Sequence, residues 1–418
     1  MFQVLSRSWA LLLGMMLLMV GNGLQGTLLG VRGGIEGFST FEMSIVMSAY
    51  FAGFLGGSRV APEMIRRVGH VRVFAALASF ISAILILYPA FAHPVAWALG
   101  RVVIGFCFSG VYVTAESWLN NSADNTNRGK ALSVYMIVQM FGIVSAQVLL
   151  AMGDVSGYAL FIVSSVLVSI SFAPILLSIS PTPAFETAKP MPLKTLIKIS
   201  PLGCFGMFLL GGVFSAQFGM SAVYGVAAGL TIAQISLFVS SIYVGALLMQ
   251  YPIGWFSDRV DRRLVILIVA SLGGVMSLVA FSFDQYFSAL LVAAFIIGGT
   301  SNPLYSLLIA YTNDYLEADD MASASGGLIF INGMGAIAGP LVTGKVMDTF
   351  GTQAFFMVIA TLMLTLTGYA GYRMTQRSRD GIEDGLYAPV MPSSSPVAVE
   401  VASEYYIETA MDEEENET

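Results

Sequence analysis

Long runs of apolar residues, separated by short polar segments, recur along the whole chain. Each run is close to the roughly 20 residues that a helix needs to cross the hydrocarbon core of a bilayer. The strands of a membrane barrel would be shorter and would alternate strictly, and these runs are too long and too evenly apolar for that. The pattern predicts twelve transmembrane helices, at residues 9–30, 41–62, 71–91, 95–117, 129–152, 157–179, 200–225, 232–256, 262–283, 286–311, 322–346 and 352–374.

Composition and charge support an all-α integral membrane protein. The 418 residues are 56% apolar and the mean hydropathy is +0.78, well above the level of a soluble domain. If the N-terminus is cytoplasmic, sixteen of the 19 Lys and Arg residues lie on the cytoplasmic side, as the positive-inside rule requires. We therefore expect a multi-pass protein of the cytoplasmic (inner) membrane with both termini in the cytoplasm.

The chain also contains an internal repeat. A shift of 193 residues aligns Gly105 with Gly298 and Asn120 with Asn313, at equivalent points of equivalent helices. Two parallel pseudo-repeats of six helices around a central pathway explain this alignment. The predicted units are an N-terminal six-helix bundle at 1–180, a cytoplasmic linker at 181–199, a C-terminal six-helix bundle at 200–376, and a disordered acidic cytoplasmic tail at 377–418.

Several motifs carry a resemblance to a known family. "GWFSDRVDRR" at 254–263 is similar to the charged loop signature of the major facilitator superfamily (MFS), and "RVVIGFCFSG" at 101–110 is similar to its Arg-containing motif in the fourth helix. "AESWLNN", "NPLYSLLIAYTNDYL" and "GAIAGP" resemble its YcaD-like branch. The resemblance implies the MFS fold and alternating access to a site between the two bundles.

The loop charges are candidates for a gate that forms in one conformation and breaks in the other. The alternative is that they only anchor the helices and satisfy the positive-inside rule. Glu116 has two interpretations: a salt bridge with Arg66, Arg67 or Arg128, which we favour, or a carboxylate that couples transport to protons. The predicted gating residues are Arg67, Arg72, Glu116, Asp258, Arg259 and Arg262.

Polar side chains on otherwise apolar helices predict a central cavity. A lone amide facing lipid would be costly, so these helix faces should look inward. Arg101, a charge within a span, should bind substrate or modulate a nearby protonation. The predicted substrate-binding residues are Asn22, Gln25, Arg101, Tyr112, Tyr135, Gln139, Gln217, Tyr224, Tyr243, Gln250, Asn302, Tyr305 and Asn332. Such a cavity suits a neutral, aromatic or mildly anionic solute.

The predicted function is secondary active transport of a small organic solute, with a nutrient or vitamin such as a flavin as the leading hypothesis. The alternatives are proton-driven efflux of drugs or metabolites, and a sensor that binds solute without moving it. We expect no enzyme, cofactor or metal site, because the chain has only two His and no zinc or nucleophile constellation. The expected partners are the solute, membrane lipid and, as a candidate coupling ion, protons. We expect a monomer without a nucleic-acid partner.

Overall fold

The protein is helical throughout the part of the chain that the structure describes. The computed structural model describes residues 2–122, 128–177, 191–376, 387, 389–395 and 397–399, and within these ranges it contains no strand. The helices are α1 (Phe2–Ile35), α2 (Thr40–Val68), α3 (His70–Ala90), α4 (Pro94–Ser122), α5 (Arg128–Met152), α6 (Ala159–Ser171), α7 (Ala173–Leu177), α8 (Leu193–Ile199), α9 (Pro201–Ser215), η2 (Ala216–Met220), α10 (Ser221–Ala227), α11 (Ile232–Ser257), α12 (Arg262–Ser282), α13 (Phe287–Asn313), α14 (Ala318–Phe350) and α15 (Ala354–Gln376).

Twelve membrane-crossing units account for all of these helices except α8. The predicted sixth span consists of α6 and α7, and the seventh consists of α9, η2 and α10. Eleven units of the described chain are long and apolar enough to cross a membrane by length and composition. The twelfth is α2, whose glycines, serines and charged residues lower its hydropathy. The structure thus confirms the twelve-helix prediction, with α8 as an unpredicted turn of helix inside the linker.

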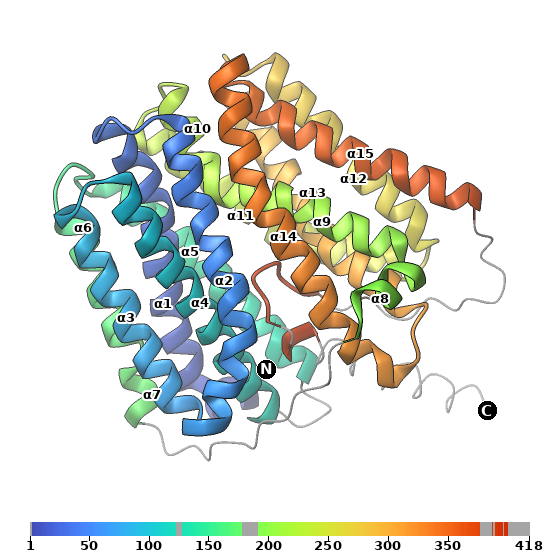
Figure 1. The fold of residues 1–418 in the computed structure, drawn as a ribbon, viewed down its shortest axis with the longest axis horizontal. Coiled ribbons are helices and arrows are strands. Elements are labelled where there is room, and N and C mark those ends of the chain that lie inside the picture. Colours follow the sequence, from blue (N-terminus) through green and yellow to red (C-terminus); the bar gives the residue numbers. More distant parts are fainter. Residues whose placement is uncertain are drawn as a thin grey trace.

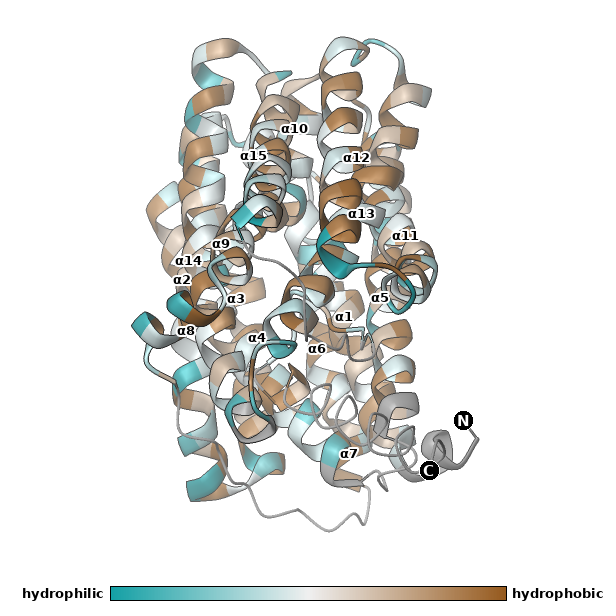
Figure 2. Cartoon of the chain, turned by 90° about the vertical axis from the view of Figure 1, so that its right-hand side faces the viewer, coloured by the Kyte–Doolittle hydropathy of each residue, from teal (hydrophilic) through white to brown (hydrophobic). Residues whose placement is uncertain are grey.

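The twelve units form two halves that lie side by side (Figure 1). The first half contains α1 to α7, where α2 packs along α4 and α1 along α5. The second half contains α9 to α15, where α11 packs along α13 and α9 along α14. The hydrophobic positions run along the lengths of the helices (Figure 2), so much of the surface is apolar.

The same backbone contact occurs once in each half. A side chain on Gly105 of α4 would collide with the backbone carbonyl of Tyr50 on α2, and one on Gly298 of α13 would collide with that of Ile242 on α11. Small residues are what allow membrane helices to approach this closely. The two glycines are one repeat apart in the sequence, so both repeats contain the same packing contact.

We expect Gly298→Ala to destabilise the second half. The added methyl group meets the backbone of α11, which has no flexible atom to move aside, and such overpacking costs about 1–3 kcal/mol. The measurement is the melting temperature of the purified protein. Gly368→Ala in α15 is the matched control, because nothing lies within 4 Å of its new methyl group. Equal melting temperatures for the two variants would show that the close approach is unimportant.

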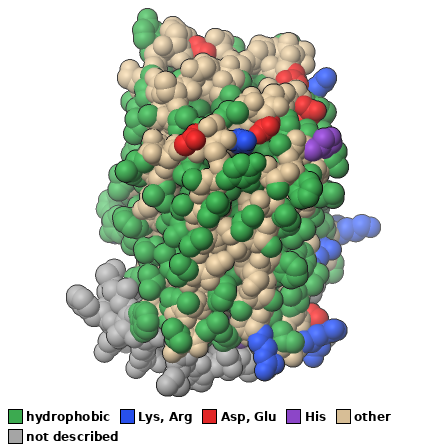
Figure 3. Space-filling model, turned by 90° about the vertical axis from the view of Figure 1, so that its left-hand side faces the viewer, with side chains coloured by type: hydrophobic (Ala, Val, Ile, Leu, Met, Phe, Trp, Pro, Cys, Tyr) green, Lys and Arg blue, Asp and Glu red, His purple; other side chains and the backbone are tan. Residues whose placement is uncertain are grey.

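The two halves contact each other near one end of the molecule. We call the end that carries residues 59–72, 194–198 and 259–263 the basic end, and the opposite end, at residues 35–40 and 350–354, the far end. Near the far end, Gly30 packs on Ala222, and the Ser48 hydroxyl donates to the Ile337 carbonyl at 2.6 Å. In the space-filling view, hydrophobic side chains cover the middle of the face and several Lys and Arg side chains gather at its lower end (Figure 3).

A candidate solute cavity between the two halves

A cavity lies between the halves and receives side chains from both. Its walls come from α1, α2, α4 and α5 on one side and from α9, η2, α10, α11, α13 and α14 on the other. Of the side chains predicted to bind solute, those that line it are Asn22, Gln25, Arg101, Tyr112, Gln217, Tyr243, Asn302 and Asn332. The structure therefore brings these eight together from both repeats.

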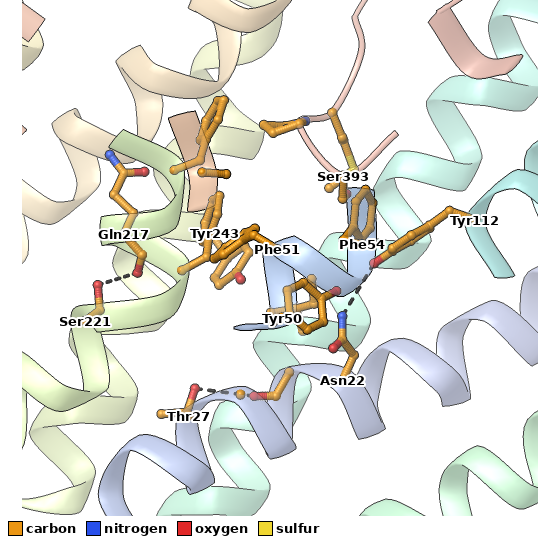
Figure 4. Close-up of a pocket in the computed structure, with 18 of the residues that line it drawn as sticks. Asn22, Thr27, Tyr50, Phe51, Phe54, Tyr112, Gln217, Ser221, Tyr243 and Ser393 are labelled. Carbon is orange, nitrogen blue, oxygen red and sulfur yellow. Dashed lines mark hydrogen bonds between the residues drawn. The ribbon is translucent and has the colours of Figure 1, made fainter. Parts of the chain in front are cut away.

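Aromatic rings form much of the apolar wall (Figure 4). Tyr50 and Phe51 meet edge to face with ring centroids 5.3 Å apart, and Phe218 stacks on Tyr243 at 5.0 Å. Phe54 continues this wall toward Tyr112. Sequence reasoning missed Tyr50, although the 193-residue repeat pairs it with Tyr243, which was selected. The cavity can therefore present flat apolar faces to an aromatic solute.

Arg101 is the buried charge of this cavity. Its side chain is only 4% exposed and lies 4.6 Å from the centroid of the Tyr50 ring. One terminal nitrogen donates to Gln25 Oε1 at 3.0 Å, and the other contacts the sulfur of Met47 at 3.5 Å. Nε has no hydrogen-bond partner, and no carboxylate of the described chain forms an ion pair with the guanidinium.

A chain of polar side chains leads away from Arg101. Gln25 Nε2 donates to Asn22 Oδ1 at 3.2 Å, and Asn22 Nδ2 donates to the Tyr112 hydroxyl at 3.5 Å (Figure 4). The Tyr112 hydroxyl in turn donates to the sulfur of Met19 at 3.3 Å. Each side chain in this series accepts a hydrogen bond from the one before it. The series therefore orients neutral dipoles toward Arg101 without supplying a negative charge.

A π-helical turn interrupts the first span of the second half. This turn, η2, carries Gln217, and π-helical turns occur frequently at functional sites. The side-chain Oε1 of Gln217 accepts from the Ser301 hydroxyl at 3.0 Å, whereas the buried Nε2 of the same side chain has no partner in the described chain. A solute oxygen could accept a hydrogen bond from this amide. The residue types alone do not predict the π-helical turn.

Five predicted binding residues do not line the cavity in this structure. Tyr224 is fully buried among Phe238, Phe355 and Phe356, and Tyr305 packs edge to face on Phe214. The other three are Tyr135, Gln139 and Gln250, which are buried closer to the basic end. All five are buried, as helical spacing predicted, but a buried position can pack against a neighbouring helix instead of lining the cavity.

The preferred salt bridges of Glu116 do not form with Arg66 or Arg67. Glu63, three and four residues before them on the same helix, pairs with both at 2.8 and 2.6 Å. Arg128 has a side chain outside the described residues. Glu116 itself is 1% exposed, and its Oε2 accepts from the backbone N–H of Ser395 at 2.7 Å. A buried carboxyl in a membrane protein is a candidate proton carrier.

Three of the four other predicted gating residues make contacts within their own half or with the tail, and the fourth is exposed. Arg262 donates twice to Asp314, at 2.5 and 2.7 Å, and Arg259 lies over the ring of Trp255. Asp258 accepts from the backbone N–H of Tyr387 at 2.7 Å, and Arg72 is exposed. Asp314, the buried partner of Arg262, was not among the residues predicted from the sequence.

Part of the acidic tail lies inside the molecule, which differs from the solvated tail predicted for 377–418. Residues 387, 389–395 and 397–399, which we call the plug segment, lie between the halves, and Met391, Pro392 and Ser393 line the cavity (Figure 4). Burial raises the pKa of the Tyr387 hydroxyl well above its ordinary value, so this group stays protonated. The remaining tail residues lie outside the described residues.

Most of the chain matches a known family. The model of the Major Facilitator Superfamily matches residues 11–231 and 203–385. The chain belongs to this superfamily. It is therefore a membrane transporter of the MFS, as the loop motifs predicted, and a multi-pass membrane protein.

This MFS chain is 27% identical over 375 residues to the "Uncharacterized MFS-type transporter YcaD" of Escherichia coli O45:K1 (strain S88 / ExPEC). The match covers 87% of this chain and 95% of that protein.

Solved MFS structures share its fold. A crystal structure of the nucleoside transporter NupG superposes with a TM-score of 0.72 at 14% identity, over 89% of this chain and 100% of that one. A bacterial homolog of the human lysosomal transporter Spinster, inward-facing and unoccupied, gives 0.69 at 12% identity, over 97% of this chain and 98% of that one. At these identities the likeness concerns the fold alone.

Proposed function

We propose that this MFS protein is a secondary carrier for a small solute that combines an aromatic ring with an anionic group. The observation that carries the proposal is Arg101, a buried guanidinium on the cavity wall without an acidic partner in the described chain. Keeping an unpaired charge in a membrane interior is costly, so a solute carboxylate or phosphate that pairs with it recovers much of that cost. The rings of Tyr50, Phe218 and Tyr243 supply the complementary apolar faces.

The anionic group on the solute distinguishes this proposal from transport of a neutral aromatic solute. A flavin without phosphate or a nucleoside is aromatic but neutral, and would leave the charge of Arg101 unpaired. Nucleosides still belong in any screen, because the NupG structure shares the fold. The positive-inside rule supports an orientation with the basic end in the cytoplasm. Uptake across the cytoplasmic membrane is part of the proposal. Efflux and binding without transport are the competing functions.

Counterflow in proteoliposomes tests the proposal. Vesicles containing the purified protein are loaded with an unlabelled solute, and entry of the labelled solute is followed, first for aromatic carboxylates and then for flavins, nucleosides and cationic drugs. We expect exchange of an aromatic anion that exceeds exchange of its neutral amide analogue. Stronger exchange of the neutral analogue would contradict the proposal, and binding without exchange would indicate a sensor.

If protons drive the transport, we expect Glu116→Gln to separate exchange from accumulation. Glutamine has the same shape and can still accept from Ser395 N–H, but it cannot carry a proton. Counterflow, which needs no net proton movement, should persist, whereas uptake driven by a pH gradient should fall to the level seen without a gradient. Glu317→Gln, at an exposed acid, is the control. Gradient-driven uptake at the normal rate in Glu116→Gln would remove Glu116 as the proton site.

A further inference from the structure

An uncharged stretch interrupts the acidic tail at the point where the tail enters the molecule. Residues 380–418 contain eleven Asp and Glu, yet 385–399, "GLYAPVMPSSSPVAV", contains none and no Lys or Arg. Its prolines at 389, 392 and 396 favour an extended backbone and reduce the entropy lost on binding. A charged segment would lose its hydration between the helices, so this composition suits the place where the plug segment lies.

The plug segment makes specific contacts with the second half. The Ser306 hydroxyl accepts from Val390 N–H at 2.9 Å and donates to the Val390 carbonyl at 3.0 Å. Gln250 Nε2 donates to the Tyr387 hydroxyl at 2.8 Å, and the Tyr387 ring packs on Gly254. These contacts satisfy the backbone groups of Val390 in a segment that turns at 392–393 and becomes helical at 397–399.

The first half holds the other end of the plug segment. Ser395 N–H donates to Glu116 at 2.7 Å, and Met391 is buried against Met140 of the first half and Ala246 of the second. Val390 is 3% exposed and Val399 is completely buried. Because the segment contacts both halves, it fills space between them on the side of the cavity that faces the basic end.

We propose that the basic end of the cavity is a peptide-binding site, that the plug segment occupies it in cis, and that its release is needed for transport. The site accepts an uncharged peptide of hydroxyl and small apolar residues that turns at 392–393 and is helical at 397–399. The segment lines the cavity and fills space between the halves toward the basic end, so it opposes both solute entry from that end and any change of access that needs this space. The effect on transport rests on the proposed carrier function, whereas occupancy of the site does not.

Labelling of a cavity cysteine tests occupancy in the full chain. Asn22→Cys places a thiol on the cavity wall, and the native Cys107 and Cys204 are buried. Val390→Asp with Val399→Asp should expel the segment and make a polar maleimide react about tenfold faster, because the segment otherwise competes at high effective concentration. A synthetic peptide of residues 385–399 added to this variant should slow labelling again. Without the peptide, and with Asn22 unchanged, the two Asp substitutions should raise counterflow several-fold.

In the matched control, Val390 and Val399 are changed to threonine, which keeps the side-chain shape without adding charge. The cavity cysteine of this control should be labelled at nearly the parent rate. If the Asp variant does not fold, Ser306→Ala removes both bonds to Val390 and should also speed labelling. Equal labelling rates in the Asp and Thr variants, or no protection by the peptide, overturn the proposal. Absence of counterflow in every variant contradicts the carrier function instead, since labelling does not depend on transport.

Discussion

Arg101→Gln should reduce uptake of the anionic solute about 100-fold. Removing one partner of a buried charge pair typically costs about 2–5 kcal/mol, and each 1.4 kcal/mol is a factor of ten in affinity. Arg101 is 4% exposed, and its partners within the described residues are Gln25, Met47 and the Tyr50 ring, so in the complex the solute anion would be its principal counter-charge. The measurement is the concentration dependence of counterflow, together with the shift in melting temperature that the solute produces.

A loss of stability would not explain such a result. Without solute, Arg101→Gln removes an unpaired charge from the membrane interior, so its melting temperature should equal or exceed that of the parent. Arg101→Lys keeps the charge but not the planar fork and should retain part of the uptake. Arg66→Gln is the matched control, since Arg66 lies at the surface beside Glu63 and outside the cavity. Unchanged uptake in Arg101→Gln would end the proposal that this residue binds the solute.

The sequence predicts most of the fold because membrane helices are determined by local hydrophobicity. The run at 157–179 corresponds to α6 and α7, and Gly105 and Gly298 identify the same close contact in both halves. The π-helical turn at Ala216–Met220, in contrast, is not predictable from hydrophobicity. It changes hydrogen-bond register within an apolar helix, and no composition signal in the run at 200–225 marks it.

The site is less predictable because helical spacing identifies a face but not what that face contacts. Gln217 and Tyr224 share a face, yet the first reaches the cavity and the second is enclosed by phenylalanines. The plug segment was missed for another reason. The net charge of the tail averages an uncharged stretch with the acids on either side of it, and the average concealed residues 385–399.

Asp314→Asn should be the most destabilising of the substitutions at the basic end. The side chains of Arg262 and Asp314 are 1% and 2% exposed, and one guanidinium nitrogen donates to both carboxylate oxygens. Breaking a buried pair leaves an uncompensated charge and costs about 3–5 kcal/mol, whereas a surface pair contributes about 0–1 kcal/mol. Thermal unfolding of the purified protein should show the loss. Arg263→Gln, at the more exposed pair with Asp261, should change the melting temperature little.

A double substitution separates a structural role for this pair from a gating role. Arg262→Met combined with Asp314→Leu removes both charges while filling the space, and such replacements are often neutral or stabilising. If the pair only joins α12 to the end of α13 within the second half, the double variant should regain both stability and transport. If Arg262 also exchanges partners when the basic end closes, stability should return while transport stays low. The second outcome would support the gating role that the loop motif implies for Arg262.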